Sequence, residues 1–131
     1  MGKLTPSVEA PLKRAKALGS SHHGAEHWWM ERLTSIALVP LVIWFVSVVI
    51  SLVRADHFQV VEYFKSPIHA ILMALFVIFS FYHTALGLQV VVEDYVHSKV
   101  KKFTTLVVIK LGLFIFAVAT LAAIAKMHFS A

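Results

Sequence analysis

The sequence predicts an all-α membrane protein whose chain crosses the bilayer three times. Three apolar stretches, residues 33–53, 68–92 and 103–124, each hold about 20 residues, which is the length that an α-helix needs to span a hydrocarbon core about 30 Å thick. The 59% hydrophobic content and the mean hydropathy of +0.78 exceed what a soluble domain of 131 residues could bury. The stretches are also too long for barrel strands and show no alternation of apolar and polar residues.

We expect residues 1–24 to form a flexible, basic cytoplasmic arm and residues 25–131 to form one transmembrane domain. The predicted helices cover about residues 26–54, 67–96 and 103–128. Pro40 should kink the first helix or weaken one of its backbone bonds, whereas Pro67 suits the first turn of the second. The links between them, a loop at 55–66 and a tight basic turn at 96–102, are short, so consecutive helices should be antiparallel neighbours.

The distribution of lysine and arginine predicts the orientation of the chain. Nine of the 12 lie in the N-terminal arm with the start of the first helix or in the second turn with the start of the third helix: Lys3, Lys13, Arg14, Lys16, Arg32, Lys99, Lys101, Lys102 and Lys110. The remaining three lie on the other side of the membrane: Arg54, Lys65 and Lys126. The positive-inside rule therefore places the N-terminus in the bacterial cytoplasm or the mitochondrial matrix. The basic charge belongs to these flanks and does not indicate nucleic acid binding.

His83, just past the middle of the second predicted helix, is the most informative residue. An ionisable side chain at that depth is costly unless it is paired, solvated or bound. A neutral imidazole is a good axial ligand for haem iron, and an apolar helix bundle is a suitable haem pocket. The alternative is a histidine that is hydrogen-bonded between helices.

Gly87, Asp94 and Tyr95, which follow His83 on the second predicted helix, extend this pattern. Gly87 lies one turn on and about 40° around the helix from His83, where a missing side chain leaves room for a flat macrocycle or for close helix packing. Asp94 lies about 20° from the face of His83 and about 16 Å further along the axis. Beside it, Tyr95 could donate a hydrogen bond to a quinone carbonyl, although an ordinary interfacial tyrosine and helix-end acid would look the same.

No second histidine of the chain reaches the depth of His83, so a haem with two histidine ligands would need a partner chain. His69, fourteen residues earlier and about 40° away, could serve a second stacked haem, but its place beside Pro67 favours an interfacial histidine. Arg32, at the first buried turn of the first helix, could neutralise a haem propionate or reach lipid phosphates. Lys110 is also expected to extend its side chain to the lipid phosphates at the membrane surface.

The second helix and the entry to the first resemble the small hydrophobic membrane anchor of succinate dehydrogenase (respiratory complex II). The matching segment of the second helix is HTALGLQVVVEDY, from His83 through Gly87 to Tyr95, and the first helix begins with Gly24-x2-His-Trp-x3-Arg-x-Thr34. The resemblance covers the chain from about residue 24 onward. The sister anchor of that complex, its cytochrome b subunit, has Arg-His after the glycine of its own motif, so Leu88-Gln89 here favours the hydrophobic anchor.

The resemblance implies that His83 is one axial ligand of the haem b iron, with the other ligand on the cytochrome b anchor. It also implies that Tyr95 and Asp94 help to form the ubiquinone site, that Arg32 faces the haem propionates, and that Gly87 packs against the haem. The implied partners are the cytochrome b anchor, the iron–sulfur subunit, the flavoprotein subunit and membrane lipids. This chain would then be one part of a heteromeric helix bundle.

The leading hypothesis is therefore a membrane anchor of succinate:quinone oxidoreductase, in a bacterial inner membrane or a mitochondrial inner membrane, that helps electrons from succinate oxidation to reach ubiquinone. The sequence contains no flavin or iron–sulfur motif, so succinate chemistry is not expected in this chain. One alternative is another haem b anchor, such as a fumarate reductase or diheme cytochrome subunit. A second is a small membrane protein without a redox centre, in which His83 and Asp94 relay protons.

Overall fold

The computed structural model describes residues 20–131, with side chains from residue 24 onward, and this part of the chain is helical without strands. Its helices are α2 (Ser20–Leu52), α3 (His57–Lys65), α4 (Pro67–Tyr95) and α5 (Lys99–His128). Three segments are long and apolar enough to cross a membrane: Gly24–Leu52, Pro67–Tyr95 and Lys99–His128. Each has 29 or 30 residues, and the prediction of three membrane-spanning helices is confirmed.

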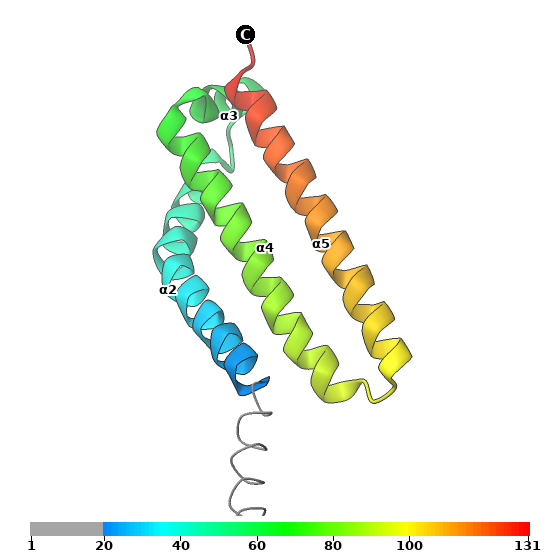
Figure 1. Cartoon of the computed structure of the whole chain (residues 1–131). Helices are drawn as coiled ribbons and strands as arrows, with labels where there is room; N and C mark the ends of the chain where they lie inside the picture. The colour runs from blue at the N-terminus through cyan, green and yellow to red at the C-terminus, as the bar shows by residue number, and fades with distance from the viewer. Residues whose placement is uncertain (1–19) are drawn as a thin grey trace, which may run out of the picture.

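The three long helices lie side by side with α4 in the middle, packed against α2 on one side and against α5 on the other (Figure 1). The start of α2 and the turn between α4 and α5 lie at one end of the described part. The short helix α3 and the C-terminus lie at the other end (Figure 1). Short links make consecutive long helices antiparallel, so the start of α2 and the lysine-rich start of α5 come to the same end.

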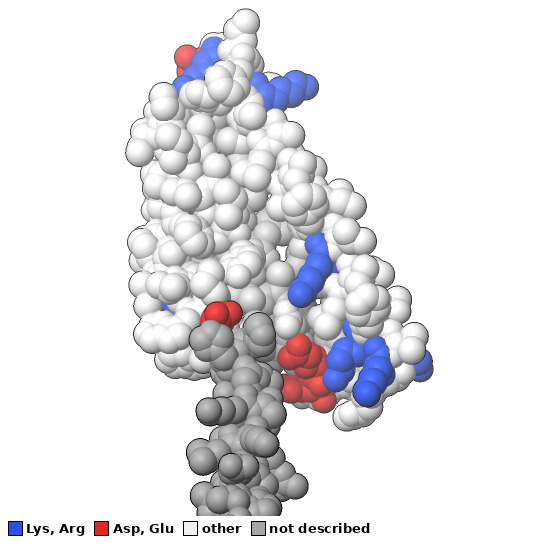
Figure 2. All heavy atoms as spheres, viewed as in Figure 1, with Lys and Arg blue, Asp and Glu red and all other residues white. Residues whose placement is uncertain are grey.

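The described part has little interior of its own. The α4–α5 contact is centred on Ala70, Val77 and Ile124, and Phe45 of α2 stacks on Phe76 of α4 with ring centroids 4.4 Å apart. Most other large apolar side chains point outward. Figure 2 shows charged side chains gathered near the two ends, with an almost uncharged belt between them, so these surfaces suit lipid or further helices.

Several predicted boundaries differ from the observed ones. α2 begins at Ser20, inside the segment expected to be an arm, while residues 1–19 lie outside the described part. α2 also continues through Pro40 without a break in the helix. α5 begins at Lys99, so only residues 96–98 form the turn for which seven residues, 96–102, were expected. The lysines at this turn belong to the first turn of α5. Because they are polar, the apolar stretch used to predict the helix does not include them, and the predicted start was too late.

The predicted loop at 55–66 is wrong, because a nine-residue helix, α3, occupies most of it. Asp56 caps this helix: its Oδ1 accepts from the Gln59 backbone N–H at 2.8 Å, and Gln59 Oε1 accepts from the Asp56 N–H at 3.1 Å. This reciprocal capping box satisfies two backbone donors that would otherwise be free. The buried Phe64 then fixes α3 against the end of the bundle.

Candidate functional site

His83 of α4 is hydrogen-bonded to Thr34 of α2, across the contact between the two helices. His83 Nδ1 lies 2.9 Å from Thr34 Oγ1. Thr34 is 1% exposed, and no other polar side chain among residues 24–131 is buried to this degree. The interpretation of His83 as a histidine hydrogen-bonded between helices therefore holds for one of its two ring nitrogens.

The other contacts of Thr34 determine which way this hydrogen bond runs. The hydroxyl oxygen lies 2.7 Å from the carbonyl oxygen of Met30 and 3.1 Å from that of Glu31. Carbonyl oxygens only accept and a hydroxyl has a single proton, so that proton goes to the backbone of α2. Toward His83 the hydroxyl oxygen must accept, which makes Nδ1 the protonated nitrogen. Nε2 then carries the lone pair, and it has no hydrogen-bond partner within the described residues.

The imidazole of His83 lines an open hollow of about 440 Å³ on the α2–α4 pair. The remaining walls come from α2, through Ser35, Leu38, Val39, Val42 and Ile43. The one polar group among these, the Ser35 hydroxyl, donates to the carbonyl oxygen of Glu31 at 2.7 Å. An apolar hollow beside an unsatisfied imidazole nitrogen has the chemistry that a flat, apolar, iron-bearing ligand requires.

Gly87, one turn beyond His83 on α4, faces open space. A Cβ placed on Gly87 would have no neighbouring heavy atom within 4 Å, its own helix backbone aside. Close packing between the helices of this chain therefore does not require a glycine here. The same open space surrounds Gly24 and Gly112.

Arg32 shares the stripe of α2 that walls the hollow. It is separated from Val39 by about 20° around the helix and about 10 Å along it, on the side nearer the start of α2. Its guanidinium lies over the ring of Trp28, 5.2 Å from the centroid. This cation–π contact holds the charged group beside Trp28, in the first part of α2.

Asp94 and Tyr95 are the last two residues of α4, and both are exposed. The chain leaves the helix at Val96, whose φ of −100° and ψ of 113° are extended. Tyr95 is 78% exposed, so its hydroxyl is accessible at the end of the bundle where α2 begins. Asp94 remains about 16 Å from His83 along the axis, and the two residues are not brought into contact.

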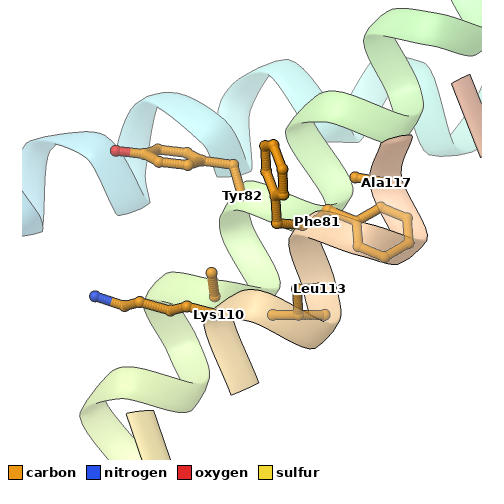
Figure 3. A pocket seen from close by; sticks show the side chains of 7 residues that line it. Phe81, Tyr82, Lys110, Leu113 and Ala117 are labelled. Atoms are coloured by element: carbon orange, nitrogen blue, oxygen red, sulfur yellow. The ribbon is translucent and has the colours of Figure 1, made fainter. Parts of the chain in front are cut away.

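A second, smaller groove of about 210 Å³ lies between α4 and α5 (Figure 3). It is lined by Phe81, Tyr82, Ala85, Lys110, Leu113, Phe114 and Ala117. The side chains of Tyr82 and Lys110 extend toward the same side of it (Figure 3). No histidine or carboxylate lines this groove, whereas the hollow on the α2 side of α4 is lined by His83.

The comparison with known families decides what kind of protein carries this site. The model of the succinate dehydrogenase/fumarate reductase transmembrane subunit matches residues 7–124. The chain belongs to this family. It is 32% identical to the succinate dehydrogenase hydrophobic membrane anchor subunit of Rickettsia bellii, over 92% of this chain and 97% of the relative. The protein of the same name from Paracoccus denitrificans is 31% identical, over 92% and 93%.

A more distant relative, the succinate dehydrogenase membrane anchor subunit of Reclinomonas americana, is 24% identical over 66% of this chain and 75% of its own length. The family model extends from before the start of α2 to within α5, so the match includes α2, α4 and most of α5. The resemblance that the motifs of the first two helices indicate is thereby confirmed at the level of the family.

Two further histidines of this family member hold α3 in place. His69 Nδ1 lies 3.0 Å from the carbonyl oxygen of Tyr63, and its ring stacks on that of Tyr63 with centroids 3.9 Å apart. His128 Nδ1 lies 3.0 Å from the carbonyl oxygen of Phe64. Burial raises the pKa of the Tyr63 phenol above its usual value. His69 is thus engaged at the α3 end, about 21 Å from His83 along α4.

Thr34 is the site residue that sequence reasoning missed, although it belongs to the helix-entry motif of the family resemblance. Nothing in the sequence pairs it with His83, which lies 49 residues away. Among the described residues, no three histidine or acidic side chains gather to hold a metal ion. Haem iron, however, is held by its macrocycle and needs only an axial nitrogen from the protein, which His83 Nε2 can supply.

Proposed function

We propose that this chain is the hydrophobic membrane anchor of a succinate:quinone oxidoreductase and that it helps to bind haem b and ubiquinone. The observation that carries the proposal is the state of His83, whose Nδ1 is bonded to Thr34 while Nε2 is unpaired among the described residues and beside an apolar hollow. Within a family of succinate dehydrogenase and fumarate reductase transmembrane subunits, that nitrogen is an axial ligand for haem iron. When bound, haem b supplies a one-electron carrier inside the membrane.

Two residues beyond the lining of the hollow, Gly87 and Arg32, are assigned to the same group. Gly87 leaves the surface of α4 flat one turn from His83, where an added Cβ would project into open space. The Arg32 guanidinium can form charge-assisted hydrogen bonds with a propionate at the end of the hollow.

Ubiquinone is assigned to the end of α4. The exposed Tyr95 hydroxyl can donate a hydrogen bond to a quinone carbonyl oxygen, which fixes the ring and favours the charge that develops on that oxygen during reduction. The adjacent Asp94 carboxylate can pass a proton from the aqueous side. Both residues lie at the end of the bundle that the lysine and arginine distribution assigns to the cytoplasm or matrix, in a bacterial or mitochondrial inner membrane.

The partners follow from what the described part of the chain lacks. A second axial histidine at the depth of His83 must come from another chain, which we assign to the cytochrome b anchor. Electrons must reach the Tyr95 end from an iron–sulfur subunit that is reduced in turn by a succinate-oxidising flavoprotein. The exposed apolar surface of α2 and α4 is consistent with a further helix-bearing partner on this side.

The test is the visible spectrum of the intact complex purified from membranes, with and without His83→Ala. We expect the wild-type complex to show a Soret band and a reduced-minus-oxidised α-band of haem b. His83→Ala should lose or strongly perturb both, because an axial ligand is removed. His69→Ala is the matched control: it removes a histidine of the same helix and should leave the spectrum unchanged.

Three results would overturn parts of this proposal. An unchanged bis-histidine spectrum in His83→Ala would remove His83 from the ligands. A loss of half the haem in His69→Ala would indicate a diheme anchor. A colourless preparation that purifies without iron–sulfur and flavoprotein subunits would favour a membrane protein without a redox centre.

A further inference from the structure

We infer that Thr34 is a positioning residue for His83, whose imidazole it fixes in the Nδ1–H form so that Nε2 is free to bind iron. The inference rests on the proposed function, since it concerns how that ligand is prepared. It deepens the proposal by identifying the residue on α2 that sets the tautomer and ring direction of a ligand on α4.

The first step is the commitment of the Thr34 proton. The Oγ1–carbonyl distance of 2.7 Å to Met30 is short and lies within α2, so this bond does not depend on how α2 and α4 pack. The lone pairs of Oγ1 are then available to accept from His83 Nδ1, 2.9 Å away. If His83 instead carried its proton on Nε2, Nδ1 and Oγ1 would face each other as two acceptors, which is repulsive.

The second step is that the neighbouring hydroxyl groups are committed elsewhere. The hydroxyl of Ser35, the next residue on α2 and a wall of the same hollow, donates to the carbonyl oxygen of Glu31 within its own helix. The hydroxyl of Thr84, beside His83 on α4, donates to the carbonyl oxygen of Ser80, also within its own helix. Thr34 is thus the hydrogen-bond partner of His83 in the described part.

The third step is that the Thr34–His83 hydrogen bond can fix the orientation of the imidazole ring as well as its tautomer. Thr34 is 1% exposed, so its oxygen is enclosed by α2 and α4 and is not replaced by water at low cost. Rotation of the imidazole about its Cβ–Cγ bond would break the Nδ1 contact. The ring therefore keeps the orientation in which Nε2 is the nitrogen available to an outside group.

Removal of the acceptor has a defined chemical consequence. Outer-sphere hydrogen bonds to a ligand histidine raise its basicity and fix its orientation, and their loss costs roughly 10- to 100-fold in metal affinity. A less basic imidazole stabilises oxidised iron less, so the haem reduction potential should rise. A residue that serves only to pack helices would change stability without this shift.

The experiment uses the intact purified complex carrying Thr34→Val, which keeps the shape of the side chain and removes the hydroxyl. We expect haem loss to a competing apoprotein to become about 10-fold faster and the haem potential, measured by redox titration, to shift upward. Thr34→Ser should restore both values, because it restores the oxygen. Thr120→Val is the matched control, since the Thr120 hydroxyl donates to the carbonyl oxygen of Phe116 within α5.

If Thr34→Val does not assemble with its partners, Thr34→Cys carries the test, because a thiol is a weaker acceptor of similar size. Its potential should then lie above that of Thr34→Ser. Wild-type potential and haem retention in the acceptor-free or acceptor-weakened variant, with His83→Ala still lacking haem, would overturn the role of Thr34 alone. A His83→Ala complex with a wild-type haem spectrum would instead overturn the ligand assignment on which this inference rests.

Discussion

α4 contacts its two neighbours in different ways. Against α5 the contact is apolar, with Ala70, Val77 and Ile124 at its centre. Against α2 it contains the Phe45–Phe76 ring stack and the hydrogen bond from His83 to the buried Thr34. The α2 side also has the hollow of about 440 Å³, next to a nitrogen without a partner in the described residues.

The difference shows how one membrane helix can serve both packing and chemistry. Lipid tails are as apolar as leucine, so helices associate in a membrane through close packing and hydrogen bonds and gain little from hydrophobic burial. The α5 side of α4 uses packing, centred on Ala70, Val77 and Ile124. The α2 side uses a hydrogen bond that fixes two residues across the contact and leaves Nε2 of His83 directed elsewhere. Changes on the two sides should therefore have separable effects.

The largest separable effect is expected from Tyr95→Phe, at the exposed end of α4. The substitution removes the hydroxyl that we assign to the quinone carbonyl, while Tyr95 is 78% exposed and contributes little to packing. Quinone reduction by the purified complex should fall about 100-fold, as for the loss of one hydrogen-bond donor to an oxygen that gains charge. Succinate oxidation with an artificial dye acceptor and the haem spectrum should stay at wild-type values.

Tyr82→Phe is the matched control, because Tyr82 belongs to the α4–α5 groove and not to the quinone end. Normal quinone turnover in Tyr95→Phe would remove Tyr95 from the site. A drop in thermal stability together with the drop in turnover would show instead that the two kinds of effect are not separable at this end of α4.

Ile124→Ala tests the opposite side of α4, with a moderate expected effect. Ile124 is 6% exposed, and its replacement leaves a cavity against Ala70 and Val77. In water such a change costs both transfer and cavity free energy, but here the separated helix would still lie in lipid, so the cavity term dominates. We expect a loss of about 1.5 kcal/mol, seen as a lower thermal midpoint of the complex.

Ile115→Ala on the same helix is the control, because Ile115 is 63% exposed to the surroundings and its truncation leaves no internal cavity. The haem potential and the quinone turnover should be unchanged in both variants. A shifted haem potential in Ile124→Ala would contradict the separation between the two sides of α4.

The same comparison explains what could be predicted from the sequence. The three spans follow from apolar length alone, and the relative angles of His83, Gly87 and Asp94 follow from their spacing along one helix. Thr34 could not be chosen in this way. Pairing a residue on α2 with one on α4 requires the register between two helices, and neither apolar length nor helical spacing contains that information.

The short helix α3 was missed for a different reason. Nine residues are too few to cross a membrane, and a helix of this length is marginal by itself in water. Its signals were nonetheless local: Asp56 and Gln59 at capping-box spacing, followed by the apolar Phe64 that becomes buried. Its attachment through the carbonyl oxygens of Tyr63 and Phe64 to two histidines, His69 and His128, depends on tertiary structure, which the sequence does not specify locally.

Asp56→Ala tests this last element, with the smallest and most local effect. It removes the carboxylate that accepts from the Gln59 backbone N–H at 2.8 Å, and loss of such a cap costs about 1 kcal/mol. Amide hydrogen exchange in the first turn of α3 should become faster, by about 5-fold for that free energy, with exchange in α4 unchanged. Glu62→Ala is the control, because its exposed pair with Lys65 contributes only about 0.3 kcal/mol. Equal exchange rates in Asp56→Ala and wild type would mean that the histidine contacts of α3, and not its cap, keep the helix formed.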